Sequence, residues 1–291
     1  MNTVIRWFIV LIILGLFAVG VAINGLLPSG YLRVIFLDVG QGDSVVIETP
    51  LGQRLVIDGG PDTSVLHQLG SRLTHFDRRI DALILTHPDL DHLNGLVELI
   101  RRYDVGAVIL TGVVHESAAY DAFFVILKQR RIPVFIPQAD LRIPLGAQTE
   151  LTFLWPTKNL VGQKPDISNN SSIVTYLTHN QRAFLLTGDA YVEVELEVLT
   201  AHPELKVDIL QLGHHGSKTS SGQTFLRRLL PKLALISAGH DNKYGHPAPE
   251  VTARLQNLGI PWLLTAESGT VEITSDGSAL WVKSGRGLEI F

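Results

Sequence analysis

Hydrophobic residues occur in two different patterns along this chain. Residues 7–27 form one apolar run without a charged side chain. At about 1.5 Å per residue, a helix of this length reaches roughly 30 Å, the thickness of a bilayer core. After residue 30 the apolar positions come in short groups separated by glycine, proline and polar turns. The pattern predicts a transmembrane anchor or signal segment over residues 1–30 and one folded domain over residues 31–291.

The charges that flank the N-terminal run predict its orientation. Arg6 precedes the run, and the next charged residue is Arg33. Positive charge marks the cytoplasmic side of a membrane segment, so we expect the remaining chain to lie outside the cytoplasm. The small residues Gly20-Val21-Ala22 offer a cleavage site, so secretion after removal of a signal peptide is the alternative. The apolar run is longer than a usual signal-peptide core, which favours a retained anchor.

Beyond residue 30, predicted strands alternate with predicted helices. In the first half we expect strands over residues 32–38, 44–49, 54–58, 80–86, 107–110, 133–136 and 151–155, and helices over 94–101 and 117–129. In the second half we expect strands over residues 172–177, 182–187, 207–212, 233–237, 262–265, 269–274 and 279–282, and helices over 192–199, 224–230 and 249–258. Two β-rich halves of this kind predict an α/β fold in which two sheets pack together with helices outside.

Composition excludes several kinds of chemistry. The chain has no cysteine, which excludes disulfides, thiolate metal sites and cysteine nucleophiles. Its formal net charge is −4, whereas proteins that hold long nucleic acids through phosphate contacts usually have a basic face. The overall charge therefore gives no support for tight, extended binding of nucleic acid.

Metal-binding side chains are concentrated directly after the predicted strand 80–86. His87, Asp89, Asp91 and His92 lie within six residues of one another. Imidazole and carboxylate groups together suit zinc, manganese or iron. Such a group at the end of an apolar strand predicts a metal site rather than a solvated loop.

Two later elements repeat this arrangement of polar groups at a strand end. His214 and His215 follow the predicted strand 207–212, and Asp189 follows the apolar strand 182–187. Adjacent histidines rarely point the same way, so we expect one to bind metal and the other to orient it or to bind substrate. Asp189 alone would be an ordinary turn residue, but together with the histidines it becomes a candidate carboxylate that bridges two metals.

These three elements, in this order, resemble the metallo-β-lactamase superfamily. The usual first motif there is His-x-His-x-Asp-His, and here Asp89 replaces the second histidine. Over residues 32–285 the chain is similar to the C-terminal hydrolase domain of the ComEC competence family. The runs that support this closer resemblance are Phe36-Leu37-Asp38-Val39-Gly40-Gln41-Gly42-Asp43-Ser44, Asp58-Gly59-Gly60, His214-His215-Gly216-Ser217 and Tyr244-Gly245-His246-Pro247. The resemblance implies a four-layer αββα sandwich.

Two departures limit what this resemblance implies. A full ComEC protein has a many-helix channel domain, whereas this chain has at most one membrane segment, so the transport role does not carry over. The superfamily's histidine between the first motif and the later aspartate is also missing, because residues 166–172 form a polar run without one. We therefore expect one metal position to be weaker or differently ligated.

The resemblance implies two divalent cations, zinc or manganese, and a set of ligands for them. The implied ligands are His87 and Asp89 for one metal, Asp91 and His92 for the other, Asp189 shared between them, and His215 as the last. His215 is preferred to its neighbour because the superfamily ligand at this point precedes a glycine. Asp91 would also orient the attacking hydroxide.

Further residues would support the ligands or contact the substrate. Asp58 would hold the ligands from behind, with an ordinary tight turn as the alternative. His246 would bind substrate or protonate the leaving group, unless it only shapes its loop. The other residues expected near the site are Asp38, Asp43, Asn169, Asn170, His214, Ser217 and Lys218.

The metal chemistry predicts hydrolysis by a metal-activated water, and the resemblance adds a substrate class. The leading hypothesis is a phosphodiesterase or nuclease related to DNA uptake, acting on single-stranded DNA beside a separate channel protein. One alternative is an esterase of the same fold that cleaves a small ester, a lactone or a phosphocholine-type group, because fold does not fix substrate. The other alternative is a metal-binding accessory to uptake that does not catalyse a reaction.

Overall fold

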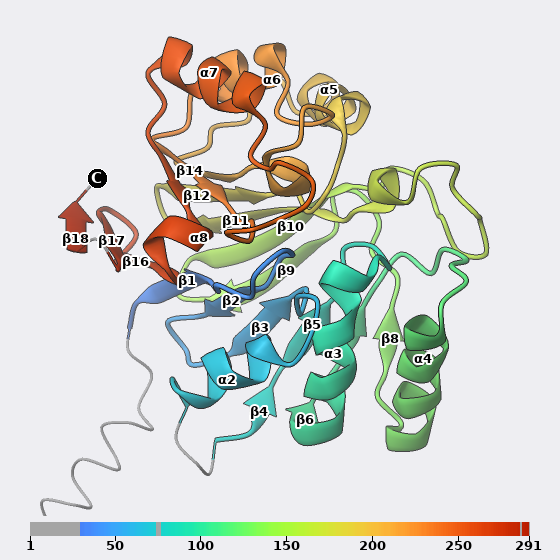
Figure 1. Ribbon diagram of the computed structural model, residues 1–291. Coiled ribbons are helices and arrows are strands. Elements are labelled where there is room, and N and C mark those ends of the chain that lie inside the picture. Colours follow the sequence, from blue (N-terminus) through green and yellow to red (C-terminus); the bar gives the residue numbers. More distant parts are fainter. Residues whose placement is uncertain (1–29, 74–76, 286, 291) are drawn as a thin grey trace, which may run out of the picture.

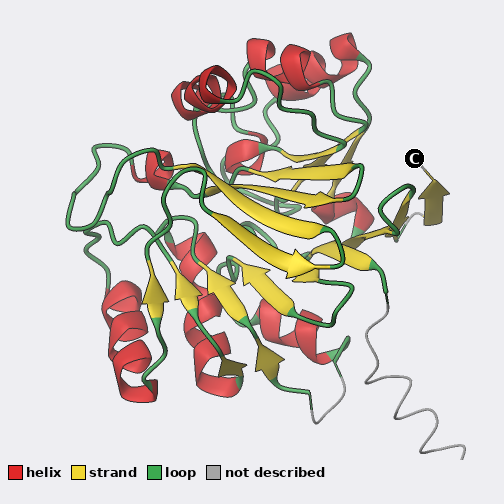
Figure 2. Ribbon diagram, turned by 180° about the vertical axis from the view of Figure 1, so that it is seen from behind, coloured by secondary structure: helices red, strands yellow, loops and turns green. Residues whose placement is uncertain are grey.

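Two β-sheets lie face to face between two groups of helices (Figures 1 and 2). The structure, a computed structural model, describes residues 30–73, 77–285 and 287–290. The predicted layering of two sheets with helices outside is therefore present. The predicted membrane segment over residues 7–27 lies outside the described residues. Among the residues that are described, no helix is both long enough and apolar enough to cross a bilayer.

The first sheet joins both ends of the described chain. Its strand order is β18-β17-β16-β1-β2-β3-β5-β7-β8, antiparallel from β18 to β3 and parallel from β3 to β8. The closing strands of the chain thus pair with its opening strand. The bounds are β1 Leu32–Phe36, β2 Val45–Glu48, β3 Arg54–Ile57, β5 Ala82–Ile84, β7 Val108–Ile109, β8 Val134–Phe135, β16 Val271–Ser275, β17 Leu280–Ser284 and β18 Gly287–Ile290.

The second sheet is built from the middle of the chain. Its strand order is β15-β14-β13-β12-β11-β10-β9, parallel from β15 to β12 and antiparallel from β12 to β9. The bounds are β9 Arg142–Gly146, β10 Thr149–Trp155, β11 Val174–His179, β12 Arg182–Leu186, β13 Ile209–Gln211, β14 Leu233–Ile236 and β15 Trp262–Leu264. The short strands β4 Arg79–Ile80 and β6 Asp104–Val105 form a separate parallel pair.

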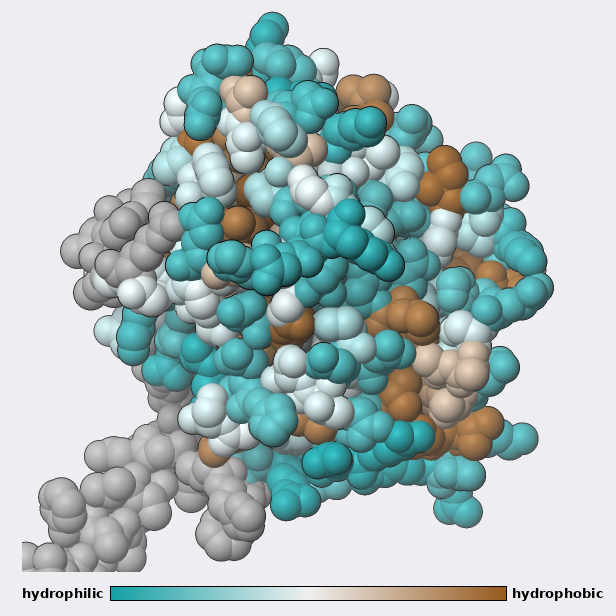
Figure 3. All heavy atoms as spheres, viewed as in Figure 1, coloured by the Kyte–Doolittle hydropathy of each residue, from teal (hydrophilic) through white to brown (hydrophobic). Residues whose placement is uncertain are grey.

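Helices cover the outer face of each sheet (Figure 1). Those on the first sheet are α2 Ser64–Gly70, α3 Leu90–Arg102 and α4 Ala118–Arg130. Those on the second are α5 Val192–Ala201, α6 Gln223–Leu229 and α7 Pro249–Leu258, while the short α8 Thr265–Ser268 follows β15. Two single-turn 3-10 helices, η1 Ser168–Ser171 and η2 Gly213–Gly216, lie in loops. The outer surface seen in Figure 3 is mainly hydrophilic with separate apolar patches, as is usual for a folded domain.

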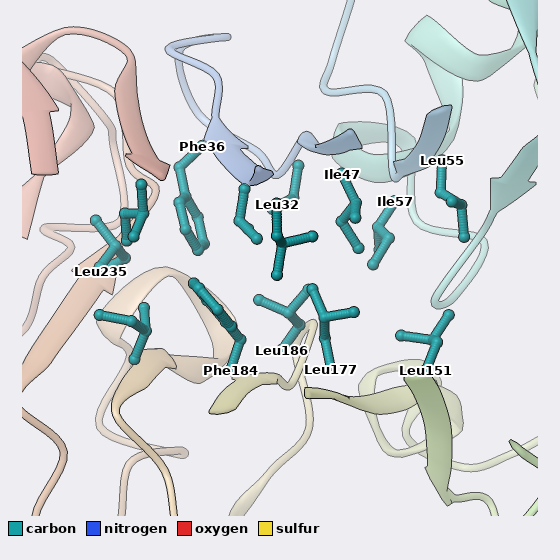
Figure 4. Close-up of a cluster of buried hydrophobic side chains, with 14 of the residues drawn as sticks. Leu32, Phe36, Ile47, Leu55, Ile57, Leu151, Leu177, Phe184, Leu186 and Leu235 are labelled. Atoms are coloured by element: carbon teal, nitrogen blue, oxygen red, sulfur yellow. The ribbon is translucent and has the colours of Figure 1, made fainter. Parts of the chain in front are cut away.

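The central strands are buried on both faces because alternate side chains point to different cores. On β1, Phe36 points into the space between the sheets, whereas Ile35 packs against the helices. On β12, Phe184 faces the first sheet and Leu185 faces the helices on the other side. Figure 4 shows Phe36 and Phe184 pointing toward one another across the central core. Each such fully buried side chain contributes about 1.5–3 kcal/mol.

Two predicted elements differ from the structure in ways that affect the site. The strand predicted over residues 80–86 is split between β4 and β5, which belong to different sheets. The helix predicted from Asn94 begins at Leu90, so Asn94 and Gly95 lie inside the helix. A Cβ on Gly95 would lie 1.8 Å from the carbonyl oxygen of Gly59. The glycine therefore lets α3 approach the backbone of the turn after β3.

Candidate metal centre

The predicted metal-binding side chains meet at the ends of strands from both sheets. His87 follows β5, and His92 lies in the first turn of α3. Asp189 follows β12, while His215 lies in η2 after β13. Strands on both sides of the central core thus deliver imidazole and carboxylate groups to one place.

Asp189 lies at the centre of this cluster. Its Oδ2 atom is 3.8 Å from Nε2 of His87 and 3.5 Å from Nε2 of His215. Its Oδ1 atom is 3.4 Å from Nε2 of His92. The residue is only 2% exposed. One buried carboxylate therefore faces the Nε2 atoms of three buried histidines.

Two further carboxylates flank the central one. Oδ2 of Asp89 is 3.6 Å from Nε2 of His87, and Oδ2 of Asp91 is 3.2 Å from Nε2 of His215. The Ser168 hydroxyl donates a 2.7 Å hydrogen bond to the other oxygen of Asp89. The side chains of Asp89 and Asp91 are each about one-third exposed. They are the parts of the cluster that solvent reaches most easily.

The three imidazole rings are held through their Nδ1 atoms. Nδ1 of His92 is 2.8 Å from Oδ2 of Asp58, and Nδ1 of His215 donates to the carbonyl oxygen of Ser237 at 3.0 Å. Nδ1 of His87 lies 3.3 Å from the hydroxyl of Ser172. The acceptors at Nδ1 of His92 and His215 fix the orientation and tautomer of these rings, and the hydroxyl contact holds the ring of His87 in place, so each Nε2 atom faces Asp189.

Three buried polar atoms of the cluster indicate the kind of ligand that it fits. Nε2 of His87, Nε2 of His92 and Oδ1 of Asp189 are buried without a hydrogen-bond partner. Leaving polar atoms unpaired in the interior is costly. Ligand atoms also converge within 4.8 Å of one another in overlapping sets, namely His87, His92 and Asp189; Asp91, His92 and His215; and Asp43, Asp189 and His215. Imidazole and carboxylate donors in this arrangement fit divalent cations such as zinc or manganese.

The electrostatics of the cluster favour positive charge. Burial alone would lower the pKa of His92, but the carboxylates of Asp189 and Asp58 raise it well above its usual range. His215 behaves in the same way beside Asp189 and Asp43. Burial would raise the pKa of Asp189, yet the neighbouring histidines hold it well below its usual range. The carboxylates thus outweigh the burial penalty, as a cation site requires.

Asp43 and Asp58 support the histidines from behind. Asp58 accepts hydrogen bonds from the backbone N–H and the hydroxyl of Thr86, at 2.8 and 2.6 Å, in addition to its contact with His92. Asp43 lies 3.4 Å from Nδ1 of His215 and accepts a 2.8 Å hydrogen bond from Gln211. Both carboxylates are almost fully buried. The structure places them where supporting residues were expected.

The two adjacent histidines of η2 were expected to point in different directions, but both rings face Asp189. Both residues adopt left-handed backbone conformations, and Nε2 of His214 lies 3.9 Å from Oδ2 of Asp189. The His214 ring stacks on Tyr191 with centroids 5.3 Å apart. The His246 ring lies 5.5 Å from that of His214. Burial, together with His214 and His215, lowers the pKa of His246 to about 4.

The structure does not bring every predicted residue to the cluster. Asp38 is half-buried, and its carboxylate accepts a hydrogen bond from the backbone of Gly40 instead. Lys218 is exposed and makes no hydrogen bond or ion pair within the described residues. Asn169 does reach the cluster, since its amide donates to Asp189 at 3.2 Å. Asn170 instead accepts a hydrogen bond from the backbone of Tyr191.

Several residues that hold the site were not predicted. The Ser172 hydroxyl accepts from the backbone N–H of Asp189 at 3.1 Å, besides its contact with His87. Ser217, which was expected to contact substrate or to support the ligands, is buried and accepts a hydrogen bond from the hydroxyl of Thr219. The serine-rich run at 168–172 was the available signal for Ser168 and Ser172, because it stands where the superfamily histidine is missing. The carbonyl of Ser237 leaves no trace in the sequence.

Comparison with known proteins agrees with this geometry. The family model described as the metallo-beta-lactamase superfamily matches residues 37–240. ComE operon protein 3 of Bacillus subtilis (strain 168) is 32% identical over 267 residues, which cover 82% of this chain and 32% of that protein. Competence protein ComA of Neisseria gonorrhoeae is 30% identical over 250 residues, which cover 84% of this chain and 32% of that protein. The chain thus spans about a third of the length of these curated relatives.

The fold is also similar to that of solved structures. Zn(2+)-bound PqqB from Methylobacterium extorquens superposes with a TM-score of 0.54 at 11% sequence identity. The match covers 82% of this chain and 99% of that one. At this identity the similarity concerns the fold alone.

Proposed function

The chain belongs to the metallo-β-lactamase superfamily, and from this membership we propose that it is a metal-dependent hydrolase that cleaves phosphodiester bonds in nucleic acid. The observation that supports hydrolysis is the convergence of three buried imidazole nitrogens on Asp189. The similarity to proteins named for competence supports nucleic acid as the substrate and DNA uptake as the setting. Because the chain has no cysteine, the metal ligands would be these histidines and carboxylates.

We propose that the cluster holds two metal positions. One would be held by His87 and Asp89, and the other by Asp91, His92 and His215, with Asp189 shared between them. Bound divalent cations would lower the pKa of a water and neutralise charge on phosphate oxygens. The imidazole Nε2 atoms are already aimed at this place because their Nδ1 atoms are bonded elsewhere.

Two residues are proposed to act on the reacting groups themselves. The side chains of Asp89 and Asp91 are 31% and 32% exposed, compared with 3% for Asp189, so solvent reaches both. Of these two carboxylates we assign Asp91, which lies 3.2 Å from Nε2 of His215, to orient the attacking water, as the superfamily resemblance implies. His246 presents a buried Nδ1 atom without a partner, while its backbone N–H donates to Asn242. We assign it to contact with a substrate oxygen.

A comparison of substrates and variants tests this function. The full chain would be stripped of metal, reloaded with zinc or manganese, and offered single-stranded DNA, duplex DNA, bis-p-nitrophenyl phosphate and a lactone. We expect hydrolysis of the diesters, and its loss in His87→Ala and Asp189→Ala. The control is His67→Ala, which removes an exposed histidine from α2.

Each other outcome rejects a stated part of the proposal. Turnover of the lactone alone would support the small-ester alternative. Bound metal without turnover of any substrate would reject both enzymatic functions and would support the metal-binding accessory that does not catalyse a reaction. Activity that survives in both cluster variants would reject the site itself.

We also propose that residues 7–27 anchor the chain in a membrane, with residues 31–291 outside the cytoplasm beside a separate channel protein. The support is the uncharged apolar run, preceded by Arg6. Resistance to carbonate extraction and digestion by external protease in spheroplasts are the expected results. An N-terminus that starts after Ala22 would show signal cleavage instead, and a chain protected from external protease would refute export.

A further inference from the structure

Glu195 is a buried carboxylate that the proposed chemistry does not use. It lies on α5 and is 2% exposed. Acidic side chains are almost never fully buried unless they are paired. Its partners are two backbone groups, because the N–H of Ser221 and the N–H of Gly222 donate to its two oxygens at 2.5 and 2.9 Å. Glu195 therefore binds the loop that follows the histidine pair.

Arg254 binds the same loop through the opposite kind of backbone group. From α7, its guanidinium donates to the carbonyl oxygens of Ser220 and Ser221 at 3.4 and 3.1 Å. Helices α5 and α7 lie on the same side of the second sheet (Figure 1). We call residues 217–222 the support loop. Helix α5 thus binds backbone N–H groups of the support loop, and helix α7 binds backbone carbonyl groups of the same loop.

The support loop is strained at Ser221, where both helices hold it. Ser221 has a φ of 54°, and His214 and His215, just before the loop, have φ values of 50° and 55°. Left-handed backbone is unfavourable for a non-glycine residue because its Cβ atom crowds the following carbonyl oxygen. Such conformations persist only where surrounding contacts enforce them. The bonds from Glu195 and Arg254 to Ser221 are contacts of this kind.

A short chain of hydrogen bonds connects the support loop to the metal centre. Nδ1 of His214 lies 2.9 Å from the Thr219 hydroxyl, which donates to Ser217 at 3.0 Å. The backbone N–H of Ser217 donates to the carbonyl oxygen of His214 at 2.8 Å. The backbone position of Thr219 is fixed from α5, since Val192 donates to its carbonyl oxygen at 3.0 Å. Movement of the loop would therefore rotate the His214 ring beside Asp189.

We propose that Glu195 and Arg254 are positioning residues that hold the support loop and thereby fix His214 at the metal centre. The proposal rests on the function proposed above for its effect on turnover, but not for its effect on His214. The charged groups that face Glu195 are Arg254 from α7 and Glu193 from its own helix. Burial raises the pKa of Glu195 to about 7, against Arg254 and the two backbone N–H groups, which lower it.

The test compares Glu195→Ala and Arg254→Met with a matched control. Glu197→Ala removes an exposed carboxylate from the same helix. The full chain is loaded with cobalt, and three properties are measured: the visible absorption of the metal, the imidazole NMR signals of His214, and kcat and KM for bis-p-nitrophenyl phosphate. We expect altered His214 signals and a kcat about tenfold lower with KM nearly unchanged, since outer supports usually cost tenfold or more. Arg254→Lys, which keeps a hydrogen-bond donor, should have a kcat between those of Arg254→Met and the wild type.

The readouts separate failure of this proposal from failure of the proposed function. If the wild-type chain hydrolyses nothing, the His214 signals still report whether the loop positions the ring. If Glu195→Ala does not fold, Arg254→Met remains informative because Arg254 is only half-buried. A lower melting temperature together with unchanged His214 signals would show a purely structural role and overturn the proposal.

Discussion

The substitution Asp58→Asn keeps the shape of a supporting carboxylate but changes the hydrogen bonds that it can accept. In the wild type, Oδ1 accepts from the backbone of Thr86, and Oδ2 receives the Thr86 hydroxyl at 2.6 Å and Nδ1 of His92 at 2.8 Å. With asparagine, the amide oxygen can keep the first bond. The amide nitrogen then faces two donors. The hydroxyl can rotate away, but the neutral form of His92, which is the form that binds metal, can adapt only by moving its proton from Nδ1 to Nε2.

That change of tautomer sets the expected magnitude. A protonated Nε2 has no lone pair for a metal, so the variant must recover the original tautomer before it binds a cation. Outer supports of this kind are worth about 10- to 100-fold in metal affinity, or about 1.4–2.7 kcal/mol. The metal-free protein should also lose about 1.5–3 kcal/mol, the value of a hydrogen bond to a charged group.

Competition with a chromophoric chelator measures the affinity, and the ring nitrogen shifts of His92 report its tautomer. Asp38→Asn is the control, because the carboxylate of Asp38 bonds only to the nearby backbone of Gly40 among the described residues. The reasoning would be refuted if Asp58→Asn kept the wild-type tautomer and bound metal as tightly as the control.

Three other predictions test the fold and its link to the site. Gly95→Ala should destabilise the protein by about 3 kcal/mol or more in urea titrations, since the new methyl group meets a backbone oxygen. Gly70→Ala, with open space around it, should instead stabilise by about 0.4–1 kcal/mol. Because the pKa of Glu195 in the fold lies near 7, above its ordinary 4.5, metal-free stability should fall by up to about 3 kcal/mol as pH rises between these values. Across this pH range the urea midpoint should change less with pH in Glu195→Gln than in the wild type. An equal dependence on pH in both proteins would contradict the prediction. Ser172→Ala should weaken metal binding about tenfold, as measured by chelator competition, because the hydroxyl holds both His87 and Asp189; an unchanged affinity would assign it no role.

The sequence could predict which residues meet, because strand ends from packed sheets converge. Asp189 and His215 follow apolar strands of one sheet, and His87 follows a strand of the other. An apolar run that stops at a polar group is visible in the sequence, and so is the fold class. The layers of helix and sheet follow from alternation such as that of Ile35 and Phe36.

What the sequence could not predict depends on backbone geometry. Asn94-Gly95 has the composition of a turn, yet it lies inside α3, where the glycine allows the helix to approach the backbone of Gly59. The paired histidines were expected to diverge, but the left-handed conformation of both turns them toward the same carboxylate. The carbonyl of Ser237 orients His215, and any residue at that position would offer the same atom.

The two proposed metal positions are supported unequally, and the missing superfamily histidine explains the difference. On one side, His92 and His215 are fixed by a buried carboxylate and a buried carbonyl oxygen. On the other side, His87 is the single imidazole, and the hydroxyls beside its Nδ1 are weaker acceptors than a carboxylate. Ser172 lies in the run where the extra histidine would stand, and it orients His87 and Asp189 without offering an imidazole ligand. A carboxylate that polarises a histidine strengthens its bond to a metal, so the position of His92 should fill before that of His87.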